Sequence, residues 1–172
     1  KIDPGRNLSS PFPSRRIMNE NKLLLVDDEE GIRRVLGISL ADSDYEVLPA
    51  ADGAEALQIF RREEPAIVLT DIKMPGLDGI ELLQQIKREN PETEVVMITG
   101  HMNIDYAINA IKKGAFDYLK KPFLLENVHA TILRVLEKQA LKRKSMELEL
   151  LKERQRIESK NLTEFMIMLA NI

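Results

Sequence analysis

The chain lacks cysteine altogether, although it has 172 residues. This absence excludes disulfide bonds, thiolate metal sites and catalysis by a thiol, and it is compatible with the reducing cytoplasm, where we expect the protein. No apolar run reaches the ~20 residues that a helix needs to cross a bilayer, so we expect no contact with a membrane. The net charge of −3 gives no sign of direct nucleic-acid binding.

The first 20 residues also lack an apolar stretch, and they carry three prolines with scattered serine and arginine. A secretory signal peptide needs an apolar segment, so this region is not one. We interpret residues 1–20 as a flexible tail that precedes the folded part of the chain.

From residue 21 to residue 138, short apolar runs alternate with segments of helical periodicity. The runs lie at 23–26, 45–48, 66–70, 95–98 and 117–119, and turn signals with glycine or proline separate them. Five strand–helix units with short connections predict an α/β fold, a doubly wound five-stranded parallel sheet with helices on both faces. The runs 23–26 and 66–70 are the most continuous, which is typical of central strands that are buried on both sides.

Three of the predicted helices show a clear apolar face. The first face combines Ile32, Val35, Leu36 and Leu40, the second combines Ile104, Ala107, Ile108 and Ile111, and the third, in the fifth helix, combines Leu125, Val128, Ile132, Val135 and Leu136. We expect these faces to pack on the sheet.

The last part of the chain, from Phe123 to Ile172, contains neither glycine nor proline. From residue 141 a regular spacing of three and four residues defines a seam in which seven of ten positions are apolar: Leu141, Lys144, Leu148, Leu151, Gln155, Glu158, Leu162, Phe165, Leu169 and Ile172. We predict that residues 139–172 continue the fifth helix as a coiled coil and form a homodimer through 141–172. A long solvated helix, or one that folds back or packs on a further domain, stays open as an alternative.

Charged residues cover the rest of this helix. Two pairs at a spacing of three, Glu149 with Lys152 and Glu153 with Arg156, can interact on its surface. We interpret the basic cluster at 142–144 as a solvated helix face rather than a nucleic-acid patch.

Aspartates follow two of the predicted strands. Asp27 and Asp28 come after the run 23–26, and Asp71 comes after the run 66–70. Ligands of an open parallel sheet bind beyond the carboxyl ends of its strands, so we expect the three carboxylates to converge there. They would repel one another unless a cation lay between them, and oxygen ligands with open positions suit Mg²⁺. A helix N-cap role for Asp27 and Asp28 is the alternative.

A hydroxyl and an amine are predicted at the same edge of the sheet. Thr99 follows the fourth strand and Lys121 follows the fifth, whereas strand alternation directs Lys120 to the opposite face. A carboxylate, a metal, a cation and a hydroxyl are the groups that phosphoryl transfer requires. An aspartate can accept the phosphoryl group covalently, as an acyl phosphate.

This ordered set of residues resembles the receiver domain of two-component response regulators, which has a flavodoxin-like (CheY-like) fold. The matching pieces are Asp27-Asp28, Asp71 with its Met-Pro-Gly-x-Asp-Gly loop, Thr99, and Lys121-Pro122-Phe123. The resemblance covers about residues 22–138, and the segment between Thr99 and Phe123 is most similar to the NtrC-type subgroup.

The resemblance implies which residues accept phosphate and bind metal. Asp71 would be the phosphoacceptor. Asp28, Asp71 and the backbone carbonyl of Lys73 would bind Mg²⁺, and Asp27 would act through water. Lys73, together with His101, would also help to set the lifetime of the phosphoryl group.

The resemblance also implies a switching mechanism. Lys121 would pair with one phosphoryl oxygen, and Thr99 would move to donate a hydrogen bond to another. Tyr118 would then turn inward as an aromatic switch, unless it is a plain core residue. In the family, the peptide bond between Lys121 and Pro122 is cis.

By the same resemblance, the partner is a sensor histidine kinase that donates its phosphoryl group to Asp71. The signal would pass through the last strand–helix units to the dimerising helix and to an output domain beyond residue 172. We expect a switch that assists only its own phosphorylation and dephosphorylation, not an enzyme. Two alternatives are a metal-dependent phosphohydrolase, disfavoured because position 73 is lysine instead of a general acid, and a dimerising scaffold that needs no phosphate.

Overall fold

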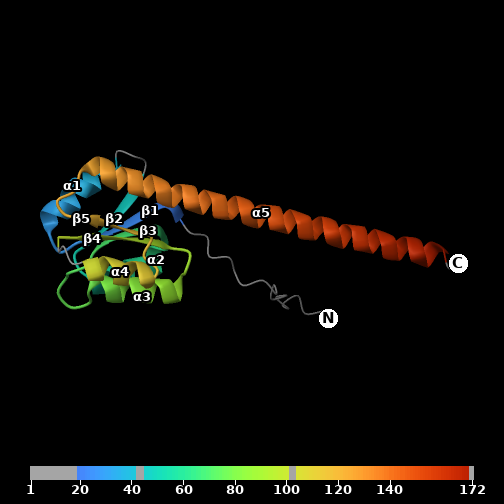
Figure 1. Ribbon diagram of the computed structural model, residues 1–172, viewed down its shortest axis with the longest axis horizontal. Helices are drawn as coiled ribbons and strands as arrows, with labels where there is room; N and C mark the ends of the chain where they lie inside the picture. Colours follow the sequence, from blue (N-terminus) through green and yellow to red (C-terminus); the bar gives the residue numbers. More distant parts are fainter. Residues whose placement is uncertain (1–18, 42–44, 101–103, 171–172) are drawn as a thin grey trace, which may run out of the picture. The chain divides into compact units, whose positions relative to one another are not determined.

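A computed structural model of the chain describes residues 19–41, 45–100 and 104–170. Strands and helices alternate along the chain, as the apolar runs predict (Figure 1). The elements are β1 (Asn19–Val26), α1 (Glu30–Ala41), β2 (Glu46–Ala50), α2 (Gly53–Glu63), β3 (Pro65–Asp71), α3 (Gly79–Glu89), β4 (Glu94–Thr99), α4 (Ile104–Lys112), β5 (Asp117–Lys120) and α5 (Leu125–Ala170). β1 therefore includes the last two residues of the predicted tail, Asn19 and Glu20.

The five strands form one parallel sheet in the order β2-β1-β3-β4-β5. This order confirms the predicted doubly wound fold, and both strands that were expected to be central, β1 and β3, are internal. The register pairs Val26 of β1 with Ala50 of β2 and with Thr70 of β3. The carboxyl ends of these three strands consequently lie level with one another.

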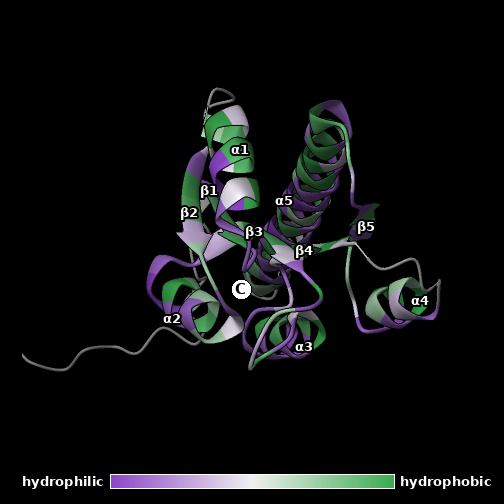
Figure 2. Cartoon of the chain, turned by 90° about the vertical axis from the view of Figure 1, so that its left-hand side faces the viewer, coloured by the Kyte–Doolittle hydropathy of each residue, from purple (hydrophilic) through white to green (hydrophobic). Residues whose placement is uncertain are grey.

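Helices cover both faces of the sheet in the first 118 residues. α1 lies across the sheet from α2 and α3, and the helices carry apolar residues in alternation with polar ones (Figure 2). Leu24 and Val26 belong to the buried cluster that contains Phe60 of α2, whereas Leu23 and Leu25, equally buried, alternate with them along β1. Each such side chain contributes about 1.5–3 kcal/mol of transfer free energy, so β1 is held from both sides.

Aspartates that follow the strand ends start two of the helices. The side chain of Asp52 accepts a hydrogen bond from the backbone N–H of Glu55 at 2.8 Å. Asp78 accepts from the N–H of Glu81 at 2.8 Å, and the Glu81 carboxylate accepts in return from the N–H of Asp78, which completes a capping box. These caps explain why α2 and α3 begin directly after Asp52 and Asp78.

The predicted helix faces are partly wrong. Val35 of α1 is exposed, and so are Ile108 and Ile111 of α4, while Ala107 and Ala110 are the buried positions of α4. Residues that follow one another are rotated by about 100° around a helix, so two adjacent apolar stripes fit the same period. Periodicity alone therefore did not show which stripe faces the sheet.

The chain forms two compact units, one ending at Tyr118 and the other beginning at Leu119. From the sequence we place a boundary at residue 138 and predict that the fifth helix continues past it. α5 does run through that point without a break. At ~1.5 Å per residue its 46 residues extend for about 70 Å. Its first turns bury four side chains, while Leu125 of the predicted stripe is exposed: Val128, Thr131, Ile132 and Val135.

No helix in the described part of the chain is both long enough and apolar enough to cross a membrane.

An ion pair connects the start of the sheet with the end of α2. The Nζ atom of Lys22 lies 2.7 Å from the carboxylate of Glu63, which also accepts a hydrogen bond from Arg62 at 2.7 Å. The hydrogen bonds from Arg62 and then from Lys22 lower the pKa of Glu63 from 4.5 to about 2. Because this folded-state pKa is depressed, the pair stabilises the fold above pH 4.5, and the contribution is lost as the pH falls through 2.

We predict that Glu63→Gln lowers the midpoint of urea unfolding at neutral pH. The difference between variant and wild type should shrink as the pH falls from 4.5 towards 2, where the wild-type carboxylate becomes protonated. Parallel urea titrations over this pH range test the prediction. A difference that stays constant at every pH would show that Glu63 acts through packing rather than charge.

Candidate functional site

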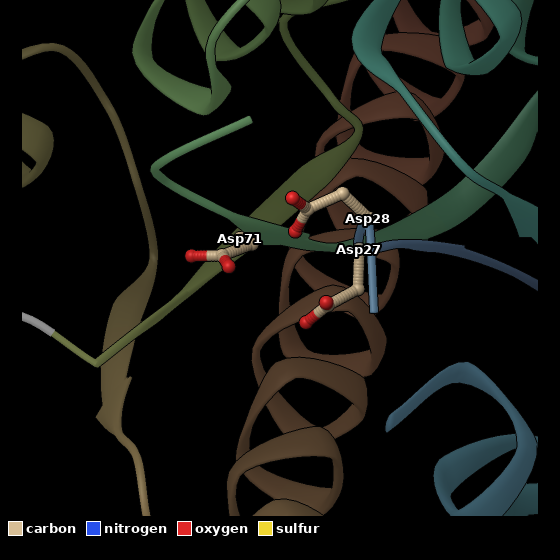
Figure 3. Close-up of side chains that lie close together, drawn as sticks. All are labelled: Asp27, Asp28 and Asp71. Atoms are coloured by element: carbon tan, nitrogen blue, oxygen red, sulfur yellow. The ribbon is translucent and has the colours of Figure 1, made fainter. Parts of the chain in front are cut away.

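Three aspartates gather where β1 and β3 end. Ligand oxygens of Asp27, Asp28 and Asp71 all lie within 4.8 Å of one another. Figure 3 shows the three side chains close together, two of them from the end of β1 and one from β3. The structure therefore confirms that the aspartates which follow the two central strands converge.

The parallel register produces this convergence. Val26 pairs with Thr70, so the residues that follow them, Asp27 and Asp71, lie at the same level of the sheet. The N–H of Asp27 donates to the carbonyl of Ala50 at 3.2 Å, which extends the pairing with β2 by one residue. The sheet thus fixes the backbones of both aspartates before any ligand binds.

The three carboxylates differ in their access to solvent. Asp27 is completely buried and Asp71 is 7% exposed, whereas Asp28 is exposed. At an effective dielectric constant near 20, two unit charges about 5 Å apart repel by roughly 3 kcal/mol. A divalent cation bound by oxygen ligands would remove this repulsion, and a set of three carboxylates fits such a cation in chemistry and in spacing.

The turn between β1 and α1 depends on Asp27. Its Oδ1 atom accepts a hydrogen bond from the N–H of Glu29 at 2.9 Å, and its backbone carbonyl accepts one from Arg33 at 2.6 Å. Asp27 thus organises the turn before α1 and also belongs to the acidic cluster. Its hydrogen bond from Glu29 lies before the first residue of α1, Glu30, so it does not bear out the N-cap alternative. Sequence reasoning missed Arg33, because its hydrogen bond joins residues six apart, a spacing that helix periodicity does not cover.

The loop after β3 shapes the other side of the cluster. The N–H of Lys73 donates to Oδ1 of Asp71 at 3.3 Å, and the N–H of Gly79 donates to the carbonyl of Ile72 at 2.9 Å. A Cβ atom at Gly79 would overlap the carbonyl oxygen of Asp71. Gly76 has a φ of 77°, in the region that favours glycine. The loop thus needs glycine at two points, one of which touches the backbone of Asp71.

The other predicted site residues have different positions. The register pairs Asp71 with Ile98, so Thr99, 5% exposed, follows at the same edge of the sheet. Tyr118 is 43% exposed, which excludes the alternative of a plain core residue. Lys121 directly follows β5 in the second compact unit, and its peptide bond to Pro122 is cis, as the resemblance implied.

The contributions of Lys121 and Tyr118 to the site stay predictions, as does the metal-binding role of the Lys73 carbonyl. His101 lies outside the described residues.

A hollow beside the acidic cluster was not predicted. It is lined by residues of the loop after β3, the start of α3 and α4: Ile72, Lys73, Met74, Pro75, Asp78, Ile80 and Tyr106. Nothing in the spacing of Tyr106 distinguishes it from an ordinary helix residue, so sequence reasoning had no signal for this hollow.

Comparison with protein families gives one match that covers most of the folded part. Residues 23–133 match the family described as "Response regulator receiver domain".

Individual relatives share the same segment. The regulatory protein AtoC of Escherichia coli (strain K12) is 36% identical over 123 residues, which are 72% of this chain and 27% of AtoC. The probable transcriptional regulator ycf27 of Porphyridium aerugineum is 40% identical over 121 residues, 70% of this chain and 50% of that protein. A crystal structure of NtrX from Brucella abortus superimposes with a TM-score of 0.71 at 40% identity, covering 75% of this chain and 29% of NtrX. The chain thus spans between about a quarter and a half of the length of these relatives.

We predict that Gly79→Ala lowers the free energy of unfolding by about 1–3 kcal/mol, because the added methyl group forces the loop away from Asp71. Urea unfolding measures the loss. Gly37→Ala is the matched control: it lies within α1 with open space around it, so alanine should stabilise that helix by up to ~1 kcal/mol. Equal effects at the two positions would contradict the contact between Gly79 and the Asp71 backbone.

Proposed function

The chain belongs to the family of response regulator receiver domains, and we propose that Asp71 is its phosphoacceptor. The observation that carries this proposal is the gathering of three carboxylates at the carboxyl edge of the sheet, with Asp71 at the end of its middle strand. The side chain of Asp71 is 7% exposed, enough for an attacking oxygen to reach a donor at the surface. The donor in this proposal is a phosphohistidine of a sensor histidine kinase.

Mg²⁺ is the proposed cofactor. Carboxylate oxygens of Asp28 and Asp71 and the backbone carbonyl of Lys73 would bind it, and Asp27 would hold one of its water ligands. When bound, the ion neutralises charge on the phosphoryl oxygens. The hydrogen bond from Glu29 to Asp27 and that from Lys73 to Asp71 orient the two carboxylates beforehand.

The transfer needs only placement and charge neutralisation. An Oδ atom of Asp71 attacks phosphorus in line with the phosphorus–nitrogen bond of the donor. The new carboxyl-oxygen–phosphorus bond forms as that bond breaks, and its electron pair leaves with the imidazole nitrogen, which takes up a proton. The product is an acyl phosphate on Asp71, so the pocket loses a carboxylate charge and acquires a phosphoryl dianion.

We propose that Thr99 and Lys121 respond to this change in charge by binding the phosphoryl group. The Thr99 hydroxyl lies at the same edge as Asp71 and would donate a hydrogen bond to one phosphoryl oxygen. Lys121 would pair with another, and Tyr118 would move from its exposed position into space that Thr99 leaves. The domain acts in this way as a phosphoacceptor switch, and we propose that an output domain reads it through the last strand–helix units and α5.

Dimerisation through residues 141–172 completes the proposal. Every described residue of α5 from 141 onward is exposed, including six apolar seam residues that are between 51% and 70% exposed: Leu141, Leu148, Leu151, Leu162, Phe165 and Leu169. An exposed apolar seam of this length is costly in water, and a second copy of the helix would bury it.

We predict that acetyl phosphate with Mg²⁺ adds one phosphoryl group to the chain, seen as a mass increase in an intact-mass spectrum. Asp71→Asn should abolish the increase, because the carboxamide is not a nucleophile of comparable strength. Asp52→Asn is the matched control, since asparagine caps α2 as well as aspartate does, and it should be phosphorylated like the wild type. Phosphorylation of the Asp71→Asn variant would contradict the assignment of Asp71 as the phosphoacceptor.

A second prediction concerns the metal. Asp28→Asn should leave the metal-free protein at least as stable as the wild type, because it removes one of three repelling charges. The same variant should bind Mg²⁺ about tenfold more weakly or worse, and so should lose most of the rise in Tm that Mg²⁺ produces. Thermal unfolding with and without saturating Mg²⁺ tests both effects. A variant that retains the full Mg²⁺-dependent rise would show that Asp28 is not a ligand.

A further inference from the structure

We propose that Arg33 of α1 is a positioning residue for the metal site. Its guanidinium holds the peptide group between Asp27 and Asp28 and thereby strengthens the binding of a divalent cation by the acidic cluster. The proposal rests on the function proposed above for this cluster and adds a residue to it. Arg33 itself offers no ligand atom, because a guanidinium is positively charged and has donors only.

The turn that carries the two aspartates is held at three points of its first residue. The N–H of Asp27 donates to the carbonyl of Ala50 at 3.2 Å, and Oδ1 of Asp27 accepts from the N–H of Glu29 at 2.9 Å. The carbonyl oxygen of Asp27 accepts from Nη1 of Arg33 at 2.6 Å. The first two contacts fix the backbone that enters the turn and the carboxylate of Asp27, whereas the third acts on the peptide group that leads to Asp28.

This third contact bears on the direction of the Asp28 side chain. The carbonyl of Asp27 and the backbone nitrogen of Asp28 belong to one planar peptide group. A hydrogen bond to the carbonyl oxygen therefore restricts rotation of the whole group, and with it the direction in which the Asp28 side chain leaves the backbone. Asp28 is exposed, whereas the carboxylates of Asp27 and Asp71 are held in buried surroundings. A restraint on its backbone consequently matters more for Asp28 than for the other two.

Arg33 is anchored well enough to provide this restraint. Its own N–H donates to the carbonyl of Glu29 at 3.1 Å, so its backbone belongs to the regular hydrogen bonding at the start of α1. The helix is held in turn by the buried side chains of Leu36 and Leu40. A hydrogen bond with a charged donor is roughly twice as strong as one between neutral groups. The guanidinium thus connects a packed helix to the peptide group of the acidic pair.

The positive charge of Arg33 has an effect of opposite sign on metal binding. A cation beside the cluster repels a divalent ion, so removal of the charge alone would strengthen binding. Loss of the positioning contact would weaken it, and groups that hold a metal ligand from behind typically change metal affinity by about 10–100-fold. We expect positioning to dominate, because Arg33 is partly exposed and solvent screens its charge, whereas its hydrogen bond is short and direct.

Mn²⁺ titrations of the complete chain test the proposal, because Mn²⁺ suits the same oxygen ligands as Mg²⁺ and electron paramagnetic resonance measures the free ion. Arg33→Gln should raise the dissociation constant for Mn²⁺ about tenfold, since glutamine is too short to reach the carbonyl oxygen. Arg33→Lys should recover most of the affinity, because an ammonium can donate to the same oxygen. Arg34→Gln is the matched control: it removes the same charge from an exposed neighbour and should leave the constant unchanged.

Three results would overturn the proposal. Tighter Mn²⁺ binding by Arg33→Gln would show that repulsion outweighs positioning. Unchanged Mn²⁺ binding with a lower Tm of the metal-free variant would show that Arg33 only stabilises the turn. Arg33→Lys that binds Mn²⁺ as weakly as Arg33→Gln would show that a donor at this position does not restore the site.

The reaction with acetyl phosphate separates this proposal from the assignment of Asp71. In Arg33→Gln, the Mg²⁺ concentration for half of the maximal rate should rise by the same factor as the Mn²⁺ dissociation constant, while the rate at saturating Mg²⁺ should change little. A lower rate at saturating Mg²⁺ with unchanged metal affinity would mean that Arg33 acts on the phosphodonor, against the proposal. A wild-type chain that is not phosphorylated would refute the proposed function, whereas the Mn²⁺ titrations would still measure the effect of Arg33.

Discussion

The site depends on one constraint: the adjacent strands β2, β1 and β3 end at the same level of the sheet. Because the carboxyl-terminal parts of β2, β1 and β3 pair in parallel and in continuous register, the residues that follow β1 and β3 lie side by side. The chain places carboxylates there, so the carboxyl edge of the buried central strands holds a concentration of negative charge. Repulsion between the carboxylates therefore destabilises the fold at the edge where the proposed function needs them, and a bound cation would remove this repulsion. The main cause of this convergence is the strand register, which brings Asp27 and Asp71 to the same level independently of the surrounding loops.

Much of the fold and of the site could be predicted from sequence because both follow from short-range patterns. Strands that are buried on both sides read as continuous apolar runs, so β1 and β3 were visible as central strands. The convergence of Asp27 with Asp71 then followed from the rule that parallel strands end at one edge. The cis bond before Pro122 came only from resemblance, because nothing in the spacing of residues encodes it.

The features that could not be predicted are those for which the sequence allows several contacts of similar quality, of which the folded chain makes only one. Val35 and Ile108 fit an apolar face as well as their buried neighbours do, and only packing decides between them. The hydrogen bond from Arg33 to the carbonyl of Asp27 joins residues six apart, beyond the reach of helix periodicity. On α5, Lys152 had one acidic candidate at a suitable spacing, Glu149, and the helix does not pair them.

Pro49 has a consequence for how copies of this protein can associate. The carbonyl of Ala50 accepts from Asp27, so β2 directs that residue's polar groups into the sheet and those of Pro49 outward. Proline has no N–H, and the open margin of β2 is therefore missing a donor where a further strand would pair. Extension of the sheet from molecule to molecule, the usual route to fibrous aggregates, is blocked at this margin. The missing donor disfavours edge-to-edge pairing of copies at β2 alone, since the other edge of the sheet is β5.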